Sequence, residues 1–291
     1  MALPSSGQLT FAALQTEFGG SNPISMSEYY RGALTTTNNT DVPTSGLIRL
    51  GDFYDAVKLI FVTISSDIKE ANIADLATAA GWDGNGPVNV TINSGVYCWS
   101  DDTSAGGLIV PASMTAAVRI FNSGYIIGRG GNGGAGVGQA GFSGGPGVQL
   151  FNSTTSITNN SGAFIAGGGG GGGGGLSSSD GSSGGGGGGR VLLGSGANAR
   201  IPTGSGADNP GGYGGASGQG GGRNGYPYAN ATGTIGDDGP YQSAGAGGGG
   251  WANAGGTSSG GGSRGGGAGG LSITGGPQFV TNNGTLFGAV G

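Results

Sequence analysis

The sequence contains no histidine and a single cysteine, Cys98. Histidine is the commonest general base and metal ligand near neutral pH, so its absence removes a Ser-His triad and most zinc sites. A lone cysteine cannot form an intrachain disulfide, and in a β-rich segment it is typically a small buried apolar residue. We therefore expect no catalytic residue, no metal site and no cofactor, and we expect that the protein is not an enzyme.

Charged residues are also scarce, above all in the second half of the chain. Residues 166–291 contain four Arg and four Asp but no Lys or Glu. A segment with so little charge has no basic surface that could bind the phosphates of a nucleic acid. It also lacks the high charge that is typical of solvated disordered tails. The longest apolar run, residues 59–62, is far too short to cross a bilayer, and the first residues do not resemble a signal peptide. We expect a soluble protein that is made in the cytoplasm and does not bind nucleic acid.

Glycine accounts for 77 of the 291 residues and is concentrated after Gly128, with nine in a row at 167–175. Within 138–147 and 212–221 a glycine recurs at every third position, which is the period of the polyproline II helix. The backbone N–H and C=O groups of such helices point outward, so helices that lie side by side can bond to each other. We predict a polyglycine II bundle over residues 128–270. A helix inside it tolerates no Cβ, whereas an outer helix needs glycine only where it touches a neighbour.

A β-rich part precedes the glycine region. Residues 58–65 have the β-branched and aromatic content of a buried strand. A helix is expected to follow, capped by Asn72 and stopped by Gly81. Its expected buried face is formed by Ile73, Leu76, Ala77 and Ala80.

A phrase of an apolar residue, asparagine, a small residue, glycine and a second apolar strand occurs four times in the chain. The copies are INSGVYC from Ile92, IFNSGYIIG from Ile120, ITNNSGAFIAG from Ile157 and FVTNNGTLFG from Phe279. Asn-Gly and Ser-Gly favour tight turns, so the copies predict stacked hairpins or rungs. Because the last copy ends the chain, we predict a platform of residues 58–127 that is joined by strands near 271–291.

The first 57 residues contain an internal repeat. LPSSGQLTFAALQTEF begins at Leu3 and VPTSGLIRLGDFYDAV begins at Val42, while a shorter copy, ISMSEYY, begins at Ile24. Each copy predicts a short strand or turn followed by a short helix. Residues 1–57 are either a plain N-terminal cap or, as we favour, a module that attaches the chain to another protein.

The segments between the glycine runs carry the candidate binding residues, which are Tyr213, Tyr226, Tyr228, Tyr241 and Trp251. Exposed aromatic side chains on rigidly held loops give a large contact area at a small entropy cost, and they stack on sugars. Alternatively, these side chains cover the ends of the glycine helices as local core. The predicted fold is mainly β with a small α content: a β-rich platform and a polyglycine II bundle with connecting loops, preceded by the repeated module.

Glycine blocks separated by aromatic-bearing loops resemble the distal adhesin of T-even bacteriophage long tail fibres. The PSSG and PTSG turns, and the run AAGWDGNGPVNVTINSGVY from Ala79, also look like segments of phage and prophage tail proteins. The resemblance implies a virion protein whose loops bind a host surface glycan or an outer-membrane protein. It also implies attachment to other tail or fibre proteins, which we assign to residues 1–57, although this module does not match the attachment domain of the T-even adhesin.

Two other functions remain possible on the sequence alone. A purely structural tail or baseplate protein would turn the same loops toward other virion proteins. An ice-binding protein would need regular columns of threonine or alanine, and the sequence shows none. Two acidic pairs, Asp101–Asp102 and Asp237–Asp238, lack the spacing of a known calcium loop, so solvated turns are favoured for both. The oligomeric state stays open between a monomer and a trimer.

Overall fold

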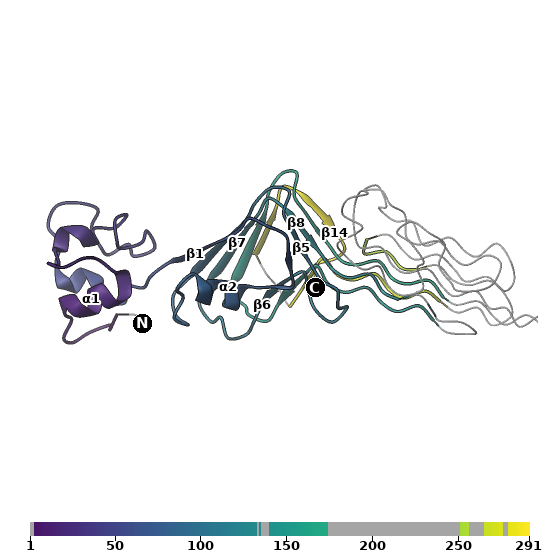
Figure 1. Cartoon of the computed structure of the whole chain (residues 1–291), viewed down its shortest axis with the longest axis horizontal. Coiled ribbons are helices and arrows are strands. Elements are labelled where there is room, and N and C mark those ends of the chain that lie inside the picture. Colours follow the sequence, from purple (N-terminus) through teal and green to yellow (C-terminus); the bar gives the residue numbers. More distant parts are fainter. Residues whose placement is uncertain (1–2, 133, 135–139, 174–250, 256–264, 276–278) are drawn as a thin grey trace, which may run out of the picture.

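The computed structural model describes residues 3–132, 134, 140–173, 251–255, 265–275 and 279–291. A small helical module of residues 3–57 lies at one end of the elongated molecule, a β-rich platform lies in the middle, and extended glycine segments run away from the platform at the other end (Figure 1). Within the described residues, no helix is long and apolar enough to span a membrane.

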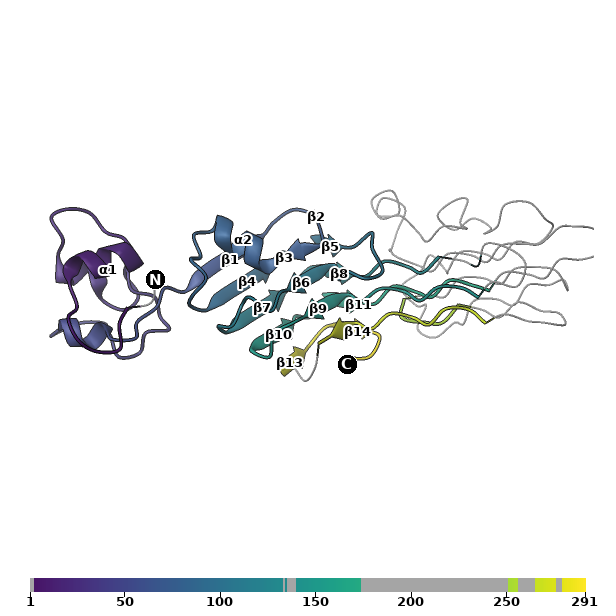
Figure 2. The ribbon, with the colours of Figure 1, turned by 90° about the horizontal axis from the view of Figure 1, so that it is seen from below.

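The platform is a three-sided parallel β-helix (Figure 2). Each of its first four turns adds one strand to each of three sheets, and the last turn adds a strand to the first two. The first sheet contains β1 (Ile60–Ile64), β4 (Val88–Ile92), β7 (Val118–Asn122), β10 (Thr155–Asn159) and β13 (Phe279–Asn282). The second contains β2 (Ile68–Lys69), β5 (Tyr97–Trp99), β8 (Tyr125–Ile127), β11 (Phe164–Ala166) and β14 (Thr285–Phe287). The third contains β3 (Ala71–Asn72), β6 (Leu108–Val110), β9 (Val148–Leu150) and β12 (Ile273–Thr274). The prediction of a mainly β fold is confirmed.

The recurring phrase forms the corner between the first and second sheets, so its copies are rungs of a β-helix and not hairpins. The platform also extends further than the sequence indicated. Residues 148–166, which we had grouped with the glycine region, supply β9, β10 and β11. The chain therefore alternates between β-helix and glycine segments instead of leaving the platform once.

The core of the platform runs through the middle of the β-helix. Because side chains alternate along a strand, one residue in two points inward, and equivalent inward residues stack from turn to turn. In the first sheet, Val62, Val90 and Ile120 form such a column. In the second sheet Cys98 stacks on Ile126, and its burial raises the pKa of the thiol to about 12. The thiolate is therefore unavailable near neutral pH, and Cys98 is the buried apolar residue that the sequence predicted.

Helix α2 (Ile73–Ala79) packs against β1, β3 and β6. The side-chain oxygen of Asn72 accepts a hydrogen bond from the Ala74 backbone N–H at 3.0 Å, as expected for an N-cap. Gly81 has a φ of 92°, the left-handed value that stops a helix. Ala80 lies outside the helix and is exposed, so the prediction that it belongs to the buried face of the helix was wrong.

A row of threonines crosses the outer surface of the first sheet, although the sequence had shown no such column. The strand register places Thr63, Thr91, Thr158 and Thr281 at equivalent positions on neighbouring strands. Phe121 takes the central place in the same row. A bulky aromatic ring in the middle breaks the flat, regular array that ice binding would need.

The N-terminal module shows one short helix for each copy of its repeat. These are α1 (Phe11–Phe18) and the short 3-10 helices η1 (Met26–Tyr29) and η2 (Leu50–Phe53). Leu14, Tyr29 and Phe53, one from each, are fully buried in a common core. Each helix therefore contributes a side chain to one small cluster, which a single copy could not build alone.

Tyrosine hydroxyls connect the copies of the repeat. Gly7 and Gly46 occupy equivalent turns and have left-handed φ values of 90° and 85°. The hydroxyl of Tyr54 donates to the Gly7 carbonyl at 2.6 Å, and the hydroxyl of Tyr30 donates to the Gly46 carbonyl. Each PSSG-type turn is thus fixed by a tyrosine from another copy, which makes the module one packed unit.

Candidate functional site

One corner of the β-helix carries the glycine segments. Between the second and third sheets the first turn needs only Glu70, whereas the second turn uses residues 100–107. At the same corner the third turn inserts residues 128–147 and the fourth inserts 167–272. Successive turns stack, so these insertions leave the platform side by side (Figure 2).

The described glycine segments form extended rods that bond to each other at every third residue. We use the name rods for residues 128–134 (residue 133 aside), 140–147, 167–173, 251–255 and 265–271. The backbone N–H groups of Gly128, Gly131 and Gly134 donate to the carbonyls of Ala166, Gly169 and Gly172 at 2.8–2.9 Å. Those of Gly141, Gly144 and Gly147 donate to Gly265, Ala268 and Leu271 at 2.9–3.1 Å. Both partners advance in steps of three, which confirms polyglycine II packing for these rods.

The 167–173 rod lies inside the bundle, and each of its residues is buried. Its N–H groups bond to two other rods. Gly168 and Gly171 donate to Gly145 and Phe142 of the 140–147 rod, and Gly170 donates to Asn253 of the 251–255 rod, each at 2.9 Å. Two further rods donate to it, because the N–H groups of Gly270 and Gly131 reach the carbonyls of Gly168 and Gly169, each at 2.8 Å. Neighbours on all sides leave no room for a Cβ, as predicted for the longest glycine run.

The 140–147 rod lies at the surface, where glycine was predicted to be needed only at positions that touch a neighbouring rod. The Phe142 side chain is 58% exposed, while its backbone carbonyl accepts hydrogen bonds inside the bundle. Ser143 is also exposed, whereas a Cβ at Gly144 would overlap the carbonyl of Gly168. Side chains are therefore tolerated on the outward positions of a rod, and glycine is required on the inward ones.

Trp251 is only 2% exposed, which contradicts its prediction as a receptor-facing aromatic residue. Its ring stacks on Phe164 with centroids 5.0 Å apart and lies 4.9 Å from the ring of Phe287. The aromatic row continues through Tyr125 to Tyr97 along the second sheet. Trp251 therefore belongs to the local core that covers the base of the rods, which was the alternative interpretation.

The other four candidates, Tyr213, Tyr226, Tyr228 and Tyr241, lie outside the described residues. The sequence analysis missed the aromatic row itself. Its signal was present, because Tyr97, Tyr125 and Phe164 each follow the glycine of a recurring phrase. Once those glycines are recognised as rung corners, the three rings must stack on one sheet.

The acidic pair Asp101–Asp102 forms a turn whose carboxylates have protein partners. Lys69 Nζ lies 3.2 Å from Asp101 Oδ2, and Asp102 Oδ1 accepts from the Ser104 backbone N–H at 2.8 Å. Donation by the backbone N–H and the hydroxyl of Ser104 holds the pKa of Asp102 below its usual value. Among the described residues no three metal-binding side chains come together, and Asp237–Asp238 lie outside that part of the chain.

The match to a family model decides the identity. The model for the phage tail fibre adhesin Gp38 matches residues 59–291, which comprise the platform and the glycine region. The chain belongs to this family. It is a phage tail fibre adhesin that serves in receptor binding, and it is a component of the virion tail. An adhesin acts by binding its target.

One solved structure is similar over nearly the full length. It is titled the crystal structure of the gp37-gp38 adhesin tip complex of the bacteriophage S16 long tail fiber. The TM-score is 0.55 at 24% identity, and the alignment covers 98% of this chain and 99% of that chain. The shared fold therefore extends into the N-terminal module, which the family model does not match. No curated protein matches the chain.

Proposed function

We propose that this adhesin recognises its host through the segments that connect the glycine rods, and that it is mounted on the tail fibre by residues 1–57. The single observation that carries this proposal is the position of the rods, because they leave the platform from one corner and run away from the N-terminal module (Figure 1). One end of the molecule is thus free for attachment while the other extends outward.

The rods suit this task because they hold chain segments rigidly without needing a large apolar core. Each rod is bonded to its neighbours through the backbone, so the segments between rods can vary in sequence while the rods stay in place. Tyr213, Tyr226, Tyr228 and Tyr241 are the proposed contact residues, and a host glycan or an outer-membrane protein is the proposed target. We propose binding without catalysis, and synthesis in the host cytoplasm before assembly.

The first prediction concerns host recognition. A variant with alanine in place of Tyr213, Tyr226, Tyr228 and Tyr241 should lose at least about 30-fold in affinity for host cells, since aromatic hot spots each contribute about 2 kcal/mol or more. The purified full-length protein is added to host cells, and its ability to block phage adsorption is titrated. Phe61→Ala is the control, because Phe61 is a 63% exposed aromatic residue on the platform. A quadruple variant that blocks adsorption as well as the parent would refute the assignment.

The second prediction concerns attachment. In the solved structure named above, gp38 is in complex with gp37, and the exposed apolar residues of the N-terminal module suit a similar contact. Leu47 is 69% exposed and Phe11 is 40% exposed. Leu47→Glu should lower the amount of adhesin on purified virions about tenfold or more, because a charge in a desolvated apolar contact has no partner.

Immunoblots of purified virions measure this incorporation. Phe61→Glu adds the same charge to the platform and should be incorporated normally. Normal incorporation of Leu47→Glu together with Phe11→Glu would instead favour attachment through another surface.

A further inference from the structure

The connector between the N-terminal module and the platform comprises residues 57–60. Segments between two packed units are commonly exposed linkers that few contacts cross. Here each of the four backbone N–H groups has a partner. Val57 donates to Asn39 Oδ1 at 2.8 Å, Lys58 to Glu17 Oε1 at 2.8 Å, Leu59 to Thr36 Oγ1 at 3.0 Å and Ile60 to the Pro87 carbonyl at 3.0 Å.

Asn39 pairs with Val57 at two points. Its side-chain oxygen accepts from the Val57 N–H, and its side-chain amide donates to the Val57 carbonyl at 2.9 Å. This pattern imitates the pairing that a neighbouring β-strand would offer. Asn39 is only 8% exposed, so these bonds are shielded from competing water.

Glu17 holds the next residue of the connector, Lys58. It lies in α1 and is also 8% exposed, although it carries a carboxylate. A hydrogen bond from an N–H to a charged acceptor is about twice as strong as one between neutral groups. The bond from the Lys58 N–H therefore ties the connector firmly to α1.

The platform contacts the same connector from the opposite direction. At Gly86, an added Cβ would lie 2.6 Å from the Lys58 carbonyl oxygen, so the two backbones are in close contact there. The Gly86 carbonyl accepts from the indole N–H of Trp82 at 3.1 Å, which ties this loop to the segment that follows α2. The connector is thus held by side chains of the module and by the backbone of the platform.

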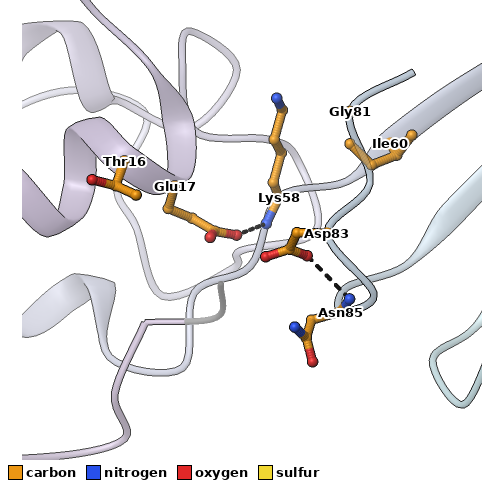
Figure 3. Close-up of a pocket in the computed structure, with 7 residues that line it drawn as sticks. All are labelled: Thr16, Glu17, Lys58, Ile60, Gly81, Asp83 and Asn85. Atoms are coloured by element: carbon orange, nitrogen blue, oxygen red, sulfur yellow. Dashed lines mark hydrogen bonds between the residues drawn. The ribbon is translucent and has the colours of Figure 1, made fainter. Parts of the chain in front are cut away.

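A pocket of about 90 Å³ lies beside the connector, between the two parts (Figure 3). Its lining comes from both, with Thr16 and Glu17 on α1, Lys58 and Ile60 on the connector, and Gly81, Asp83 and Asn85 on the platform. Asp83 Oδ1 accepts from the Asn85 backbone N–H at 3.0 Å (Figure 3). Both parts thus approach each other closely around the joint.

We propose that this joint is a rigid coupling that holds the N-terminal module and the platform in one fixed orientation. Glu17, Thr36 and Asn39 are then positioning residues, because they set the direction of the glycine rods without touching a receptor. A freely hinged adhesin would present its binding surface correctly for only a fraction of the time, and its apparent affinity would fall by that fraction. The rigidity of the joint does not depend on the proposed function. The effect of the joint on infection, however, rests on the proposed function.

Distance measurements between two spin labels test the joint directly. Thr40 in the module and Thr91 on β4 are both exposed, and each is replaced by cysteine in the full chain for labelling. Buried Cys98 does not compete for the label. The parent should give one narrow distance distribution by double electron–electron resonance.

The Glu17→Ala, Asn39→Ala double variant should broaden this distribution at least about twofold, since an unrestrained linker samples a wide range of separations. Glu17→Gln keeps the acceptor oxygen and should restore the narrow distribution when compared with Glu17→Ala alone. This single-site pair decides the matter if the double variant fails to fold. A broad distribution in the parent, or equal widths for Glu17→Ala, Glu17→Gln and the parent, would overturn the proposal.

Host binding then separates positioning from general damage. Isolated Glu17→Ala protein should bind cells as the parent does, while phage that carry it should adsorb several-fold more slowly. Weaker binding by the isolated variant would indicate damage to the fold and would contradict a positioning role. If the isolated parent itself failed to bind cells, the proposed function would fail, but the distance distributions would still decide whether the joint is rigid.

Discussion

Gly168→Ala should destroy the packing of the glycine rods, whereas Gly265→Ala should leave it intact. A Cβ at Gly168 would overlap the carbonyl oxygen and carbon of Arg129, which belong to the backbone of a neighbouring rod. No side chain can rotate away to make room. Because overpacking typically costs about 1–3 kcal/mol even where side chains can adjust, we expect a loss of at least about 3 kcal/mol here.

The neighbouring rod also cannot shift cheaply. The N–H groups of Gly128, Gly131 and Gly134 in this rod donate to the carbonyls of Ala166, Gly169 and Gly172. The two segments are therefore bonded at every third residue. Moving this rod away breaks several backbone bonds, each with a net contribution of about 0.5–1.5 kcal/mol. At Gly265, in contrast, an added Cβ meets no atom within 4 Å.

Hydrogen exchange measures this difference. In the parent, the amides of Gly128, Gly131, Gly141 and Gly144, which donate hydrogen bonds within the bundle, should be protected. In Gly168→Ala they should exchange rapidly, and adsorption should be lost with them. Gly265→Ala should match the parent in both assays. Protection of Gly168→Ala at the parent's level would show that side-chain exclusion does not hold the bundle together.

The glycine period was readable from the sequence because its cause is local. Each rod repeats the same contact every third residue, so the spacing of glycine marks the inward positions directly. The sequence also indicates the outward positions, because Phe142 and Ser143 lie between the glycines of an outer rod. Which rod lies beside which was not readable, because bonds such as Gly167–Ala252 join residues far apart in the chain.

The recurring phrase shows a different limit. Gly95 and Gly162 have positive φ values of 78° and 82°, so turn chemistry explains them. Gly124 and Gly284 do not; a Cβ on either would instead overlap a backbone carbonyl of the platform. Glycine is therefore required for two different reasons at this position of the phrase. Because both hairpins and β-helix rungs can need such a glycine, the phrase alone could not distinguish them.

Trp251 was misjudged, and the bonds that hold the connector were not predicted, for a common reason. An aromatic residue beside glycine could be exposed or buried, and its partner rings, Phe164 and Phe287, are distant in the sequence. The connector resembled a simple boundary because the groups that hold it, such as Glu17 and Asn39, belong to no periodic pattern. Contacts of single polar or aromatic side chains become visible only with the fold.

Asn159→Ala should be the most damaging single substitution at the corner between the first and second sheets. Asn159 is fully buried and lies in a ladder of asparagines that crosses three turns of the β-helix. Its oxygen accepts from Asn122 Nδ2 at 2.8 Å, and its amide donates to Asn282 Oδ1 at 2.8 Å and to the Thr285 carbonyl at 3.2 Å. Its loss takes a hydrogen-bond partner from the Asn122 amide, the Asn282 side-chain oxygen and the Thr285 carbonyl.

The substitution removes three hydrogen bonds, each with a net contribution of about 0.5–1.5 kcal/mol, so Asn159→Ala should lower the free energy of unfolding by about 2–4 kcal/mol. Asn283→Ala is the matched control, because the Asn283 side chain is exposed and its backbone N–H still bonds to the Asn159 carbonyl at 2.8 Å. Urea unfolding followed by circular dichroism gives both values. A loss for Asn159→Ala no larger than that of the control would mean that the ladder adds no stability.

The ladder also predicts where the damage would spread. Asn159 and Asn282 are 123 positions apart, and the longest insertion, residues 167–272, lies between them in the sequence. Their bond joins the turn from which the chain enters that region to the last turn, which it forms after returning. The last turn holds the base of the bundle in its place, because the Phe287 carbonyl accepts from the Gly167 N–H at 3.0 Å and its ring packs on Trp251. Asn159→Ala should therefore increase hydrogen exchange at Gly167 and in β13 and β14 before it affects β1 and β4, and equal loosening of all turns would contradict this order.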